Sequence, residues 1–235
     1  MPAPLDQLAA TKALLRSALI DGQFGDVAVV SSFGADSGVL LDLVARIKPD
    51  APVLFINTHM LFAETLAYKS TLTRHLGLTN VRTISPSADA IREKDQWGRL
   101  HLDNPDACCD FRKSKVLDEA LEGFTGWITG RKRFQAVTRS QIEPIEKTPE
   151  GKAKLNPLAR WTENAVAEYA ALVDLPQHPL LGHGYKSIGC ASCTGPVRSG
   201  EDSRAGRWRN TEKTECGIHF HNGKPVSGDQ THAAQ

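Results

Sequence analysis

The chain has 235 residues, of which 40% are hydrophobic and 23% charged, as is typical of a globular domain. Its formal net charge is +1, so global charge gives no sign of a nucleic-acid or membrane partner. The N-terminus lacks the basic start and long apolar run of a signal peptide, and no stretch reaches the roughly 18 apolar residues that span a bilayer. We therefore expect a cytoplasmic protein with no nucleic-acid or membrane partner.

Predicted helices and strands alternate along the chain. An amphipathic helix is expected in residues 1–22. Short apolar runs predict strands at residues 26–32, 51–58, 81–85 and 126–130. Helices are expected between or after them, at residues 38–47, 61–78, 108–124 and 161–175. Thr162 is the expected N-cap of the last helix, and Pro176 its stop signal.

This alternation predicts an α/β fold with a doubly wound, mainly parallel sheet covered by helices on both faces. Such sheets bind ligands at the carboxyl ends of their strands, where the winding reverses. After about Gly195 the apolar periodicity stops. We therefore divide the chain into an α/β domain, residues 1–194, and a polar tail, residues 195–235, which either docks on the domain or stays mobile.

The turn "SSFGADSG" (Ser31–Gly38) joins the first buried strand to a helix. A helix N-terminus offers free N–H groups and partial positive charge, which suit a phosphate group. The turn matches neither of the common glycine-rich phosphate motifs, so a capped turn without a ligand stays an alternative. The acidic side chain of Asp36 favours a small phosphate or sulfate group over a triphosphate. The candidate binding residues are Ser32, Phe33, Gly34, Ala35, Asp36 and Ser37.

Four of the five cysteines form two close pairs, Cys108–Cys109 and Cys190–Cys193. Four thiolates suit tetrahedral zinc or an iron–sulfur cluster, although core cysteines or a strained bridge would also account for them. Adjacent cysteines on a helix point about a quarter-turn apart, which favours two irons of one [4Fe–4S] cluster over a single zinc ion. Lys113 lies four residues after Cys109, on the same helical face, and would stand between the cluster and an anionic substrate.

The fifth cysteine, Cys216, lies on the polar tail in the sequence "TECGIHFH". Because the other four are used in pairs, it is left over for chemistry. A thiol becomes a nucleophile when neighbouring cations lower its pKa. Basic residues flank Cys216 or precede it on the tail, namely Lys213, His219, Arg204, Arg207 and Arg209. We therefore predict a nucleophilic cysteine that the tail carries to the substrate.

Several segments carry a resemblance to a known family: "SSFGADS", "CCDFRK", "WITGRKRFQAVTRS", "KLNPLARWT", "GYKSIGCASCT", "GEDSRAGRW" and "ECGIH". From about Val27 to His219 the chain resembles the phosphoadenylylsulfate/adenylylsulfate reductases, and among them the assimilatory adenylylsulfate (APS) reductases. The resemblance implies a fold of the adenine nucleotide α-hydrolase-like type, related to the ATP pyrophosphatases. It also implies reduction of an activated sulfate nucleotide to sulfite and AMP, with thioredoxin or glutaredoxin as the electron donor.

Site residues carry over from the family's motifs. Cys216 matches the catalytic nucleophile, and the four paired cysteines match the [4Fe–4S] ligands. Lys113 matches a basic residue between the cluster and the substrate. Ser32–Ser37 match the nucleotide loop. The arginines that match those near the substrate's anionic groups are Arg139, Arg204 and Arg207.

The resemblance implies a mechanism in which the Cys216 thiolate attacks the sulfuryl sulfur, AMP leaves, and thioredoxin releases sulfite from the thiosulfonate. Three alternatives stay open. The first is a phosphoadenylylsulfate (PAPS) reductase, which uses the 3′-phosphorylated substrate; cluster-bearing members favour the unphosphorylated one. The others are a tRNA-thiolating enzyme of the ATP-pyrophosphatase type and a non-catalytic zinc module. The oligomeric state, a homo-oligomer included, also stays open.

Overall fold

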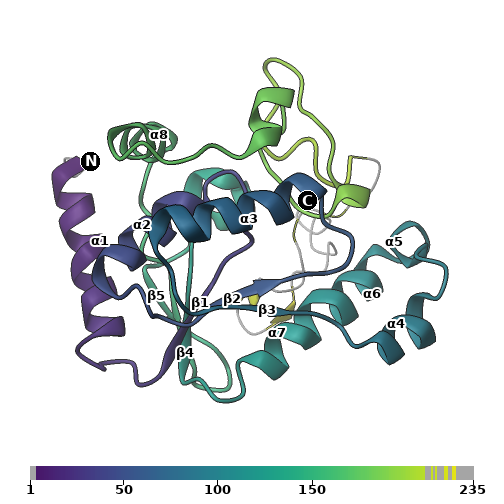
Figure 1. Cartoon of the computed structure of the whole chain (residues 1–235), viewed down its shortest axis with the longest axis horizontal. Coiled ribbons are helices and arrows are strands. Elements are labelled where there is room, and N and C mark those ends of the chain that lie inside the picture. The colour runs from purple at the N-terminus through teal and green to yellow at the C-terminus, as the bar shows by residue number, and fades with distance from the viewer. Residues whose placement is uncertain (1–3, 210–212, 214, 216–219, 222–223, 226–235) are drawn as a thin grey trace, which may run out of the picture.

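A six-stranded sheet forms the centre of the computed structural model, which describes residues 4–209, 213, 215, 220–221 and 224–225 (Figure 1). Its strands are β1 (Val27–Val30), β2 (Val53–Ile56), β3 (Val81–Ile84), β4 (Gly126–Thr129), β5 (Ile145–Lys147) and β6 (Ala153–Leu155). They lie in the order β3-β2-β1-β4-β6-β5, and all pairs are parallel except β5 with β6. The prediction of a mainly parallel sheet is therefore confirmed.

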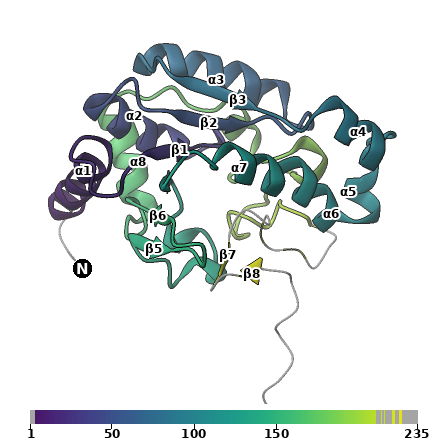
Figure 2. The same ribbon diagram turned by 90° about the horizontal axis from the view of Figure 1, so that it is seen from below.

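Helices cover both faces of the sheet (Figure 2). They are α1 (Pro4–Leu19), α2 (Ser37–Ile47), α3 (Ala63–Leu76), α4 (Ala88–Asp95), α5 (Leu100–Asp103), α6 (Pro105–Cys109), α7 (Lys115–Ala120) and α8 (Glu163–Leu172). The larger core joins one face to α1, α2, α3 and α8. The smaller core joins the other face to α7. Because alternate strand residues point to opposite faces, Ile128 belongs to the first core and Trp127 to the second.

Helix α2 positions the turn that precedes it. Its residues from Gly38 to Val44 are all buried, because α1, α3 and α8 surround it on the sheet. Full burial of one leucine or valine side chain contributes about 1.5–3 kcal/mol, so several such residues hold the helix firmly in place. The first turn of α2, and with it the strand-to-helix turn at Ser31–Ser37, is thereby fixed at the carboxyl end of β1.

The helix predicted at residues 108–124 is interrupted by a π-helical turn. Asn104 caps α6, with its side chain accepting from the Ala107 amide, and Pro105 occupies the first turn. The π turn, Asp110–Ser114, follows Cys109 directly and leads into α7. Single π turns inside α-helices are rare and occur often at functional sites.

The first part of the C-terminal segment packs on the α/β domain. Within the segment the Gly195 amide donates to the Gly206 carbonyl at 2.8 Å, and the Trp208 amide donates to the Cys193 carbonyl of the domain at 3.1 Å. Trp208 is buried, and Lys213 pairs with Asp106 of α6. Short strands β7 (Phe220–His221) and β8 (Lys224–Pro225) pair with each other. Residues 195–209 of the predicted tail therefore dock on the domain. The division of the chain at residue 194 stays a prediction.

Among the helices described, none is both long and apolar enough to span a membrane.

Candidate active site

A cavity of about 700 Å³ opens at the carboxyl ends of the parallel strands. Its walls include the turn after β1, Thr58 after β2, and Gly130–Lys132 after β4. Within the sheet, β1 lies between β2 and β4, so the chain continues from β1 to one neighbour and later returns to the other. The cavity therefore lies where the winding reverses, which is the position predicted from the sequence.

The turn residues expected to bind an anion line this cavity, with one exception. Ser32, Gly34 and Asp36, and with them Ala35 and Ser37, are in its wall. Phe33 is not: its side chain is fully buried in the core, edge-on to Phe55 with the ring centroids 5.4 Å apart. Its side chain therefore contributes nothing to the cavity wall, and its membership of the nucleotide loop stays a prediction. Phe33 instead anchors the turn from behind.

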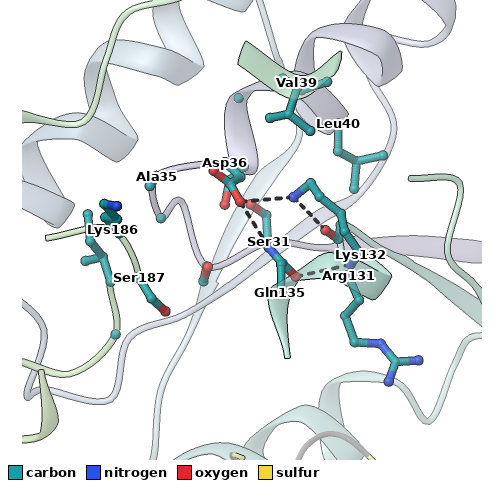
Figure 3. Close-up of a pocket in the computed structure, with 18 of the residues that line it drawn as sticks. Ser31, Ala35, Asp36, Val39, Leu40, Arg131, Lys132, Gln135, Lys186 and Ser187 are labelled. Carbon is teal, nitrogen blue, oxygen red and sulfur yellow. Dashed lines mark hydrogen bonds and ion pairs between the residues drawn. The ribbon is translucent and has the colours of Figure 1, made fainter. Parts of the chain in front are cut away.

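Asp36 precedes the first residue of α2, but its side chain does not cap the helix. Its carboxylate accepts from Gln135 Nε2 at 3.0 Å and lies 3.4 Å from Lys132 Nζ, as Figure 3 shows. Burial lowers the pKa of Lys132, and the nearby Asp36 carboxylate opposes this. Because Lys132 compensates the charge of Asp36, the N-terminus of α2 can face an anionic group in the cavity despite the acidic residue beside it.

Basic side chains from widely separated segments meet in the cavity. Lys113 comes from the π turn, and Arg139 from a short 3₁₀ helix at Val137–Arg139. Arg204 and Arg207 come from the docked C-terminal segment. The structure thus places in one cavity wall all four basic residues that the sequence analysis predicted to lie near the substrate. It adds Arg131 and Lys132, whose position directly after the fourth predicted strand is a signal that could have identified them.

Glu215 is a site residue that the sequence analysis missed. It lines the cavity, is only 3% exposed, and follows Arg139 by 76 positions. Arg139 donates to both of its oxygens, from Nε at 2.7 Å and Nη2 at 2.8 Å. Arg204 Nη2 donates to the same carboxylate at 3.1 Å. Cys216, the predicted nucleophile, lies outside the described residues, but its neighbour in the sequence is in the cavity wall.

A buried lysine lies behind the cavity wall. Lys154 of β6 is opposite Trp127 of β4, and its Nζ lies 5.6 Å from the centre of that indole ring. Within the described part of the chain this amine is buried without a hydrogen-bond partner. Burial first, and then the Arg131 charge, lower the pKa of Lys154 to about 7, although Glu146 opposes them. Near neutral pH this lysine therefore carries only part of the positive charge of an ordinary lysine behind Trp127, which itself lines the cavity.

The two cysteine pairs lie at the end of the cavity next to α6. Cys190 lines the cavity, and Cys109 packs with Cys193 and Trp208. Burial raises the pKa of the Cys108 thiol to about 11, and the negative charges of Cys190 and Cys193 add to this, whereas Arg112 opposes it. The structure thus brings the two predicted pairs into one region. Among the described residues, no three His, Cys, Asp or Glu side chains are placed to hold a single metal ion.

A buried ion pair joins the π turn that follows Cys109 to α4, and the same arginine contacts the loop beside Cys190. Arg112 of the π turn donates to Asp95 Oδ2 at 2.8 Å and to the Thr58 carbonyl at 2.7 Å, and both charged side chains are buried. The Thr58 hydroxyl lies 3.3 Å from Cys190 Sγ. Burial acts to raise the pKa of Asp95, but the Leu100 amide and the Arg112 guanidinium outweigh it, so this pKa lies below its usual value.

Comparisons with known proteins agree with this geometry. Residues 26–196 match the model of the phosphoadenosine phosphosulfate reductase domain. The chain is 47% identical to the adenosine 5′-phosphosulfate reductase of Mesorhizobium japonicum, over 83% of this chain and 76% of that protein. It is 40% identical to the phosphoadenosine 5′-phosphosulfate reductase of Gloeobacter violaceus, over 83% of each chain.

Solved structures give the same result. A phosphoadenylyl-sulfate reductase from Candida auris, in complex with phosphate, has a TM-score of 0.67 and 26% identity, covering 80% of this chain and 90% of the other. The FMN adenylyltransferase of Candida glabrata, with a TM-score of 0.60 and 16% identity over 84% of this chain and 66% of the other, shares the fold alone. From the matched domain, the close relatives and the cavity at the carboxyl ends of the strands, we conclude that the chain belongs to the phosphoadenosine phosphosulfate reductase family.

Proposed function

We propose that this protein reduces adenylylsulfate to sulfite and AMP, with thioredoxin or glutaredoxin as the thiol donor, in the cytoplasm. One observation carries the proposal. One cavity is lined by the turn before α2 that we predict to bind the phosphate, by Arg139 and Arg204, and by Glu215, the residue next to Cys216. Relatives named adenosine 5′-phosphosulfate reductase, at 37–47% identity, support the same reaction.

In this proposal the chain's own residues bind and orient the nucleotide. The N-terminus of α2 and the Ser32–Ser37 turn would hold the phosphate, because a helix start provides N–H donors and partial positive charge. Lys113, Arg139, Arg204 and Arg207 would surround the sulfuryl group. Positive groups fixed around the sulfuryl oxygens stabilise the charge that develops as the bond to AMP breaks.

The reaction itself is thiol chemistry on the tail, residues 195–235. The Cys216 thiolate attacks the sulfuryl sulfur, the bond from that sulfur to the phosphate oxygen breaks, and AMP leaves with the bonding pair. A thiolate of the reduced donor then attacks Cys216 Sγ, breaks its bond to the sulfonate, and releases sulfite. The second thiol of the donor resolves the mixed disulfide and regenerates Cys216. The two electrons therefore come from two thiols of the donor.

A [4Fe–4S] cluster held by Cys108, Cys109, Cys190 and Cys193 is part of the proposal. The donor set fits, because the thiols come from two segments that meet beside Trp208, and a cubane takes each thiolate on a different iron. When bound, the cluster would supply structural order and a fixed charge beside the cavity. Lys113 follows Cys109 by four residues and lines the cavity, so it would lie between that charge and the substrate.

Two sulfonucleotides, tested side by side with reduced thioredoxin, check the proposed function. Adenylylsulfate is expected to give the higher kcat/KM, with sulfite and AMP formed in equal amounts. A preference of tenfold or more for the 3′-phosphorylated substrate, equivalent to about 1.4 kcal/mol, would instead identify a PAPS reductase. Sulfite from neither nucleotide would contradict both assignments.

Metal analysis checks the cofactor. Protein purified without oxygen is expected to be brown and to contain about four irons and four labile sulfides per chain, as one cubane requires. A Cys193→Ser variant should lose most of the iron, because it removes one of the four thiolates. Stoichiometric zinc without labile sulfide would show that the cluster assignment is wrong.

A further inference from the structure

Glu215 occupies the arginines that an anionic substrate needs. We propose that this carboxylate is a built-in competitor of the nucleotide: it binds Arg139 and Arg204 when the cavity is empty and is displaced when the anion of the substrate binds. The inference rests on the proposed function, since it takes the sulfonucleotide as the ligand of the cavity. It adds a residue that controls both substrate affinity and the docking of the segment next to Cys216.

The geometry at Arg139 makes the two ligands exclusive. Arg139 uses the Nε and Nη2 edge of its guanidinium for the two oxygens of Glu215, at 2.7 and 2.8 Å. Its Nη1 donates to Gln135 Oε1 at 2.7 Å. The paired edge is the one that matches phosphate and sulfate oxygens. An incoming anion can therefore form this bidentate contact only after Glu215 has left.

Charge leads to the same conclusion. The Glu215 side chain is only 3% exposed, and two arginines and the Thr138 hydroxyl, at 3.3 Å, bind its carboxylate. A second anion beside it would add like-charge repulsion in an environment with little water. This repulsion does not arise if the two anions change places, so that the nucleotide binds the arginines and the Glu215 carboxylate moves into water.

The contacts that hold the rest of the segment do not depend on Glu215. Trp208 stays buried against Cys109 and Cys193, and Lys213 pairs with Asp106 on α6. The exchange therefore releases Glu215 while the chain before it keeps its contacts with the domain. Cys216 follows Glu215 directly in the sequence, so the same event frees the backbone next to the proposed nucleophile.

The test compares Glu215→Gln with the parent, both in a Cys216→Ser background that binds adenylylsulfate without reacting. The amide keeps the shape of the side chain but not its charge. Binding of adenylylsulfate, measured by calorimetry, is expected to be about tenfold tighter in the variant, equivalent to 1.4 kcal/mol. Adenosine, which lacks the anionic group, should bind equally to both proteins. Glu201→Gln is the matched control: Glu201 pairs with Arg209 on the same segment, outside the cavity, and its loss should leave both affinities unchanged.

Unchanged or weaker binding of adenylylsulfate by Glu215→Gln would overturn the proposal and make Glu215 a residue that only positions the arginines. A measurement on protein that keeps Glu215 does not depend on how the Glu215→Gln variant folds. Addition of adenylylsulfate to the Cys216→Ser protein should speed amide hydrogen exchange in the peptide that contains Glu215. Slower or constant exchange in that peptide would equally contradict the inference. Neither result depends on turnover, so failure here is distinguishable from failure of the proposed reaction.

Discussion

Replacement of Cys216 by serine is expected to abolish sulfite formation while the protein still folds and binds nucleotide. A serine hydroxyl is a far poorer nucleophile near neutral pH than a thiolate. The neighbours of Cys216 in the sequence are mostly polar, so we expect the loss of one sulfur atom to leave no cavity in a core and to change stability little. Activity should therefore fall to background while the melting temperature and nucleotide affinity stay near those of the wild type.

A trapping experiment checks this result directly. Wild-type protein incubated with sulfur-labelled adenylylsulfate, without thioredoxin, should carry the label on the peptide that contains Cys216. A thiol reductant should then release that label as sulfite. The serine variant should carry none. Near-normal turnover of the variant, or a label on Cys108, Cys109, Cys190 or Cys193, would assign the nucleophile elsewhere.

Replacement of Asp95 by asparagine is expected to lower the free energy of unfolding by about 3–5 kcal/mol, the usual cost of removing one partner of a buried ion pair. Arg112 would keep its charge and its contact with the Thr58 carbonyl, but it would lose the carboxylate that compensates it. Because Arg112 joins the π turn to the loop beside Cys190, the variant should also retain less iron through purification.

Chemical denaturation and metal analysis measure these effects. The control is Asp89→Asn, which removes the partner of Arg92 in an ion pair on the exposed surface of the same helix, α4. Exposed pairs contribute only about 0–1 kcal/mol. If both variants lost the same small amount of stability, and both kept their iron, the interior pair would not have the role in joining these segments that its position indicates.

Much of the fold is predictable from the sequence because the central strands are strongly apolar. β1 and β2 are continuous hydrophobic runs, β4 has Trp127 and Ile128 at its centre, and each of the three predicted ranges contains the observed strand. β5 and β6 were missed because each has only three residues, of which two in β5 (Glu146 and Lys147) and one in β6 (Lys154) are charged. Lys154, at the centre of β6, gives no local sign that it is buried; only pairing with β4 places it there.

The candidate site likewise contains residues that the sequence predicts and residues that only the structure reveals. The turn after β1 and the cysteine pairs were predictable because each is a local cluster of chemically special residues. Glu215 was not, since its importance comes from Arg139, 76 positions earlier, and no local pattern connects them. Phe33 is the reverse case: it stands inside the predicted binding turn, but its side chain is buried in the core. Its backbone has a φ of +49°, which costs about 1–2 kcal/mol outside glycine, and burial of its ring offsets this cost.

The π turn at Asp110–Ser114 has a consequence for how the two ends of one helical segment are aligned. Each residue advances an α-helix by about 100°, and a π turn holds one residue more than an α-helical turn. The cysteines on α6 and the apolar residues of α7, such as Leu117, are therefore offset in rotation from what a straight α-helix would impose. A straight α-helix with the same number of residues would turn Cys108 and Cys109 about 100° around the helix axis relative to Leu117, away from Cys190 and Cys193. The π turn absorbs this extra residue, so that the cysteines face their partners while the apolar residues of α7 face the sheet.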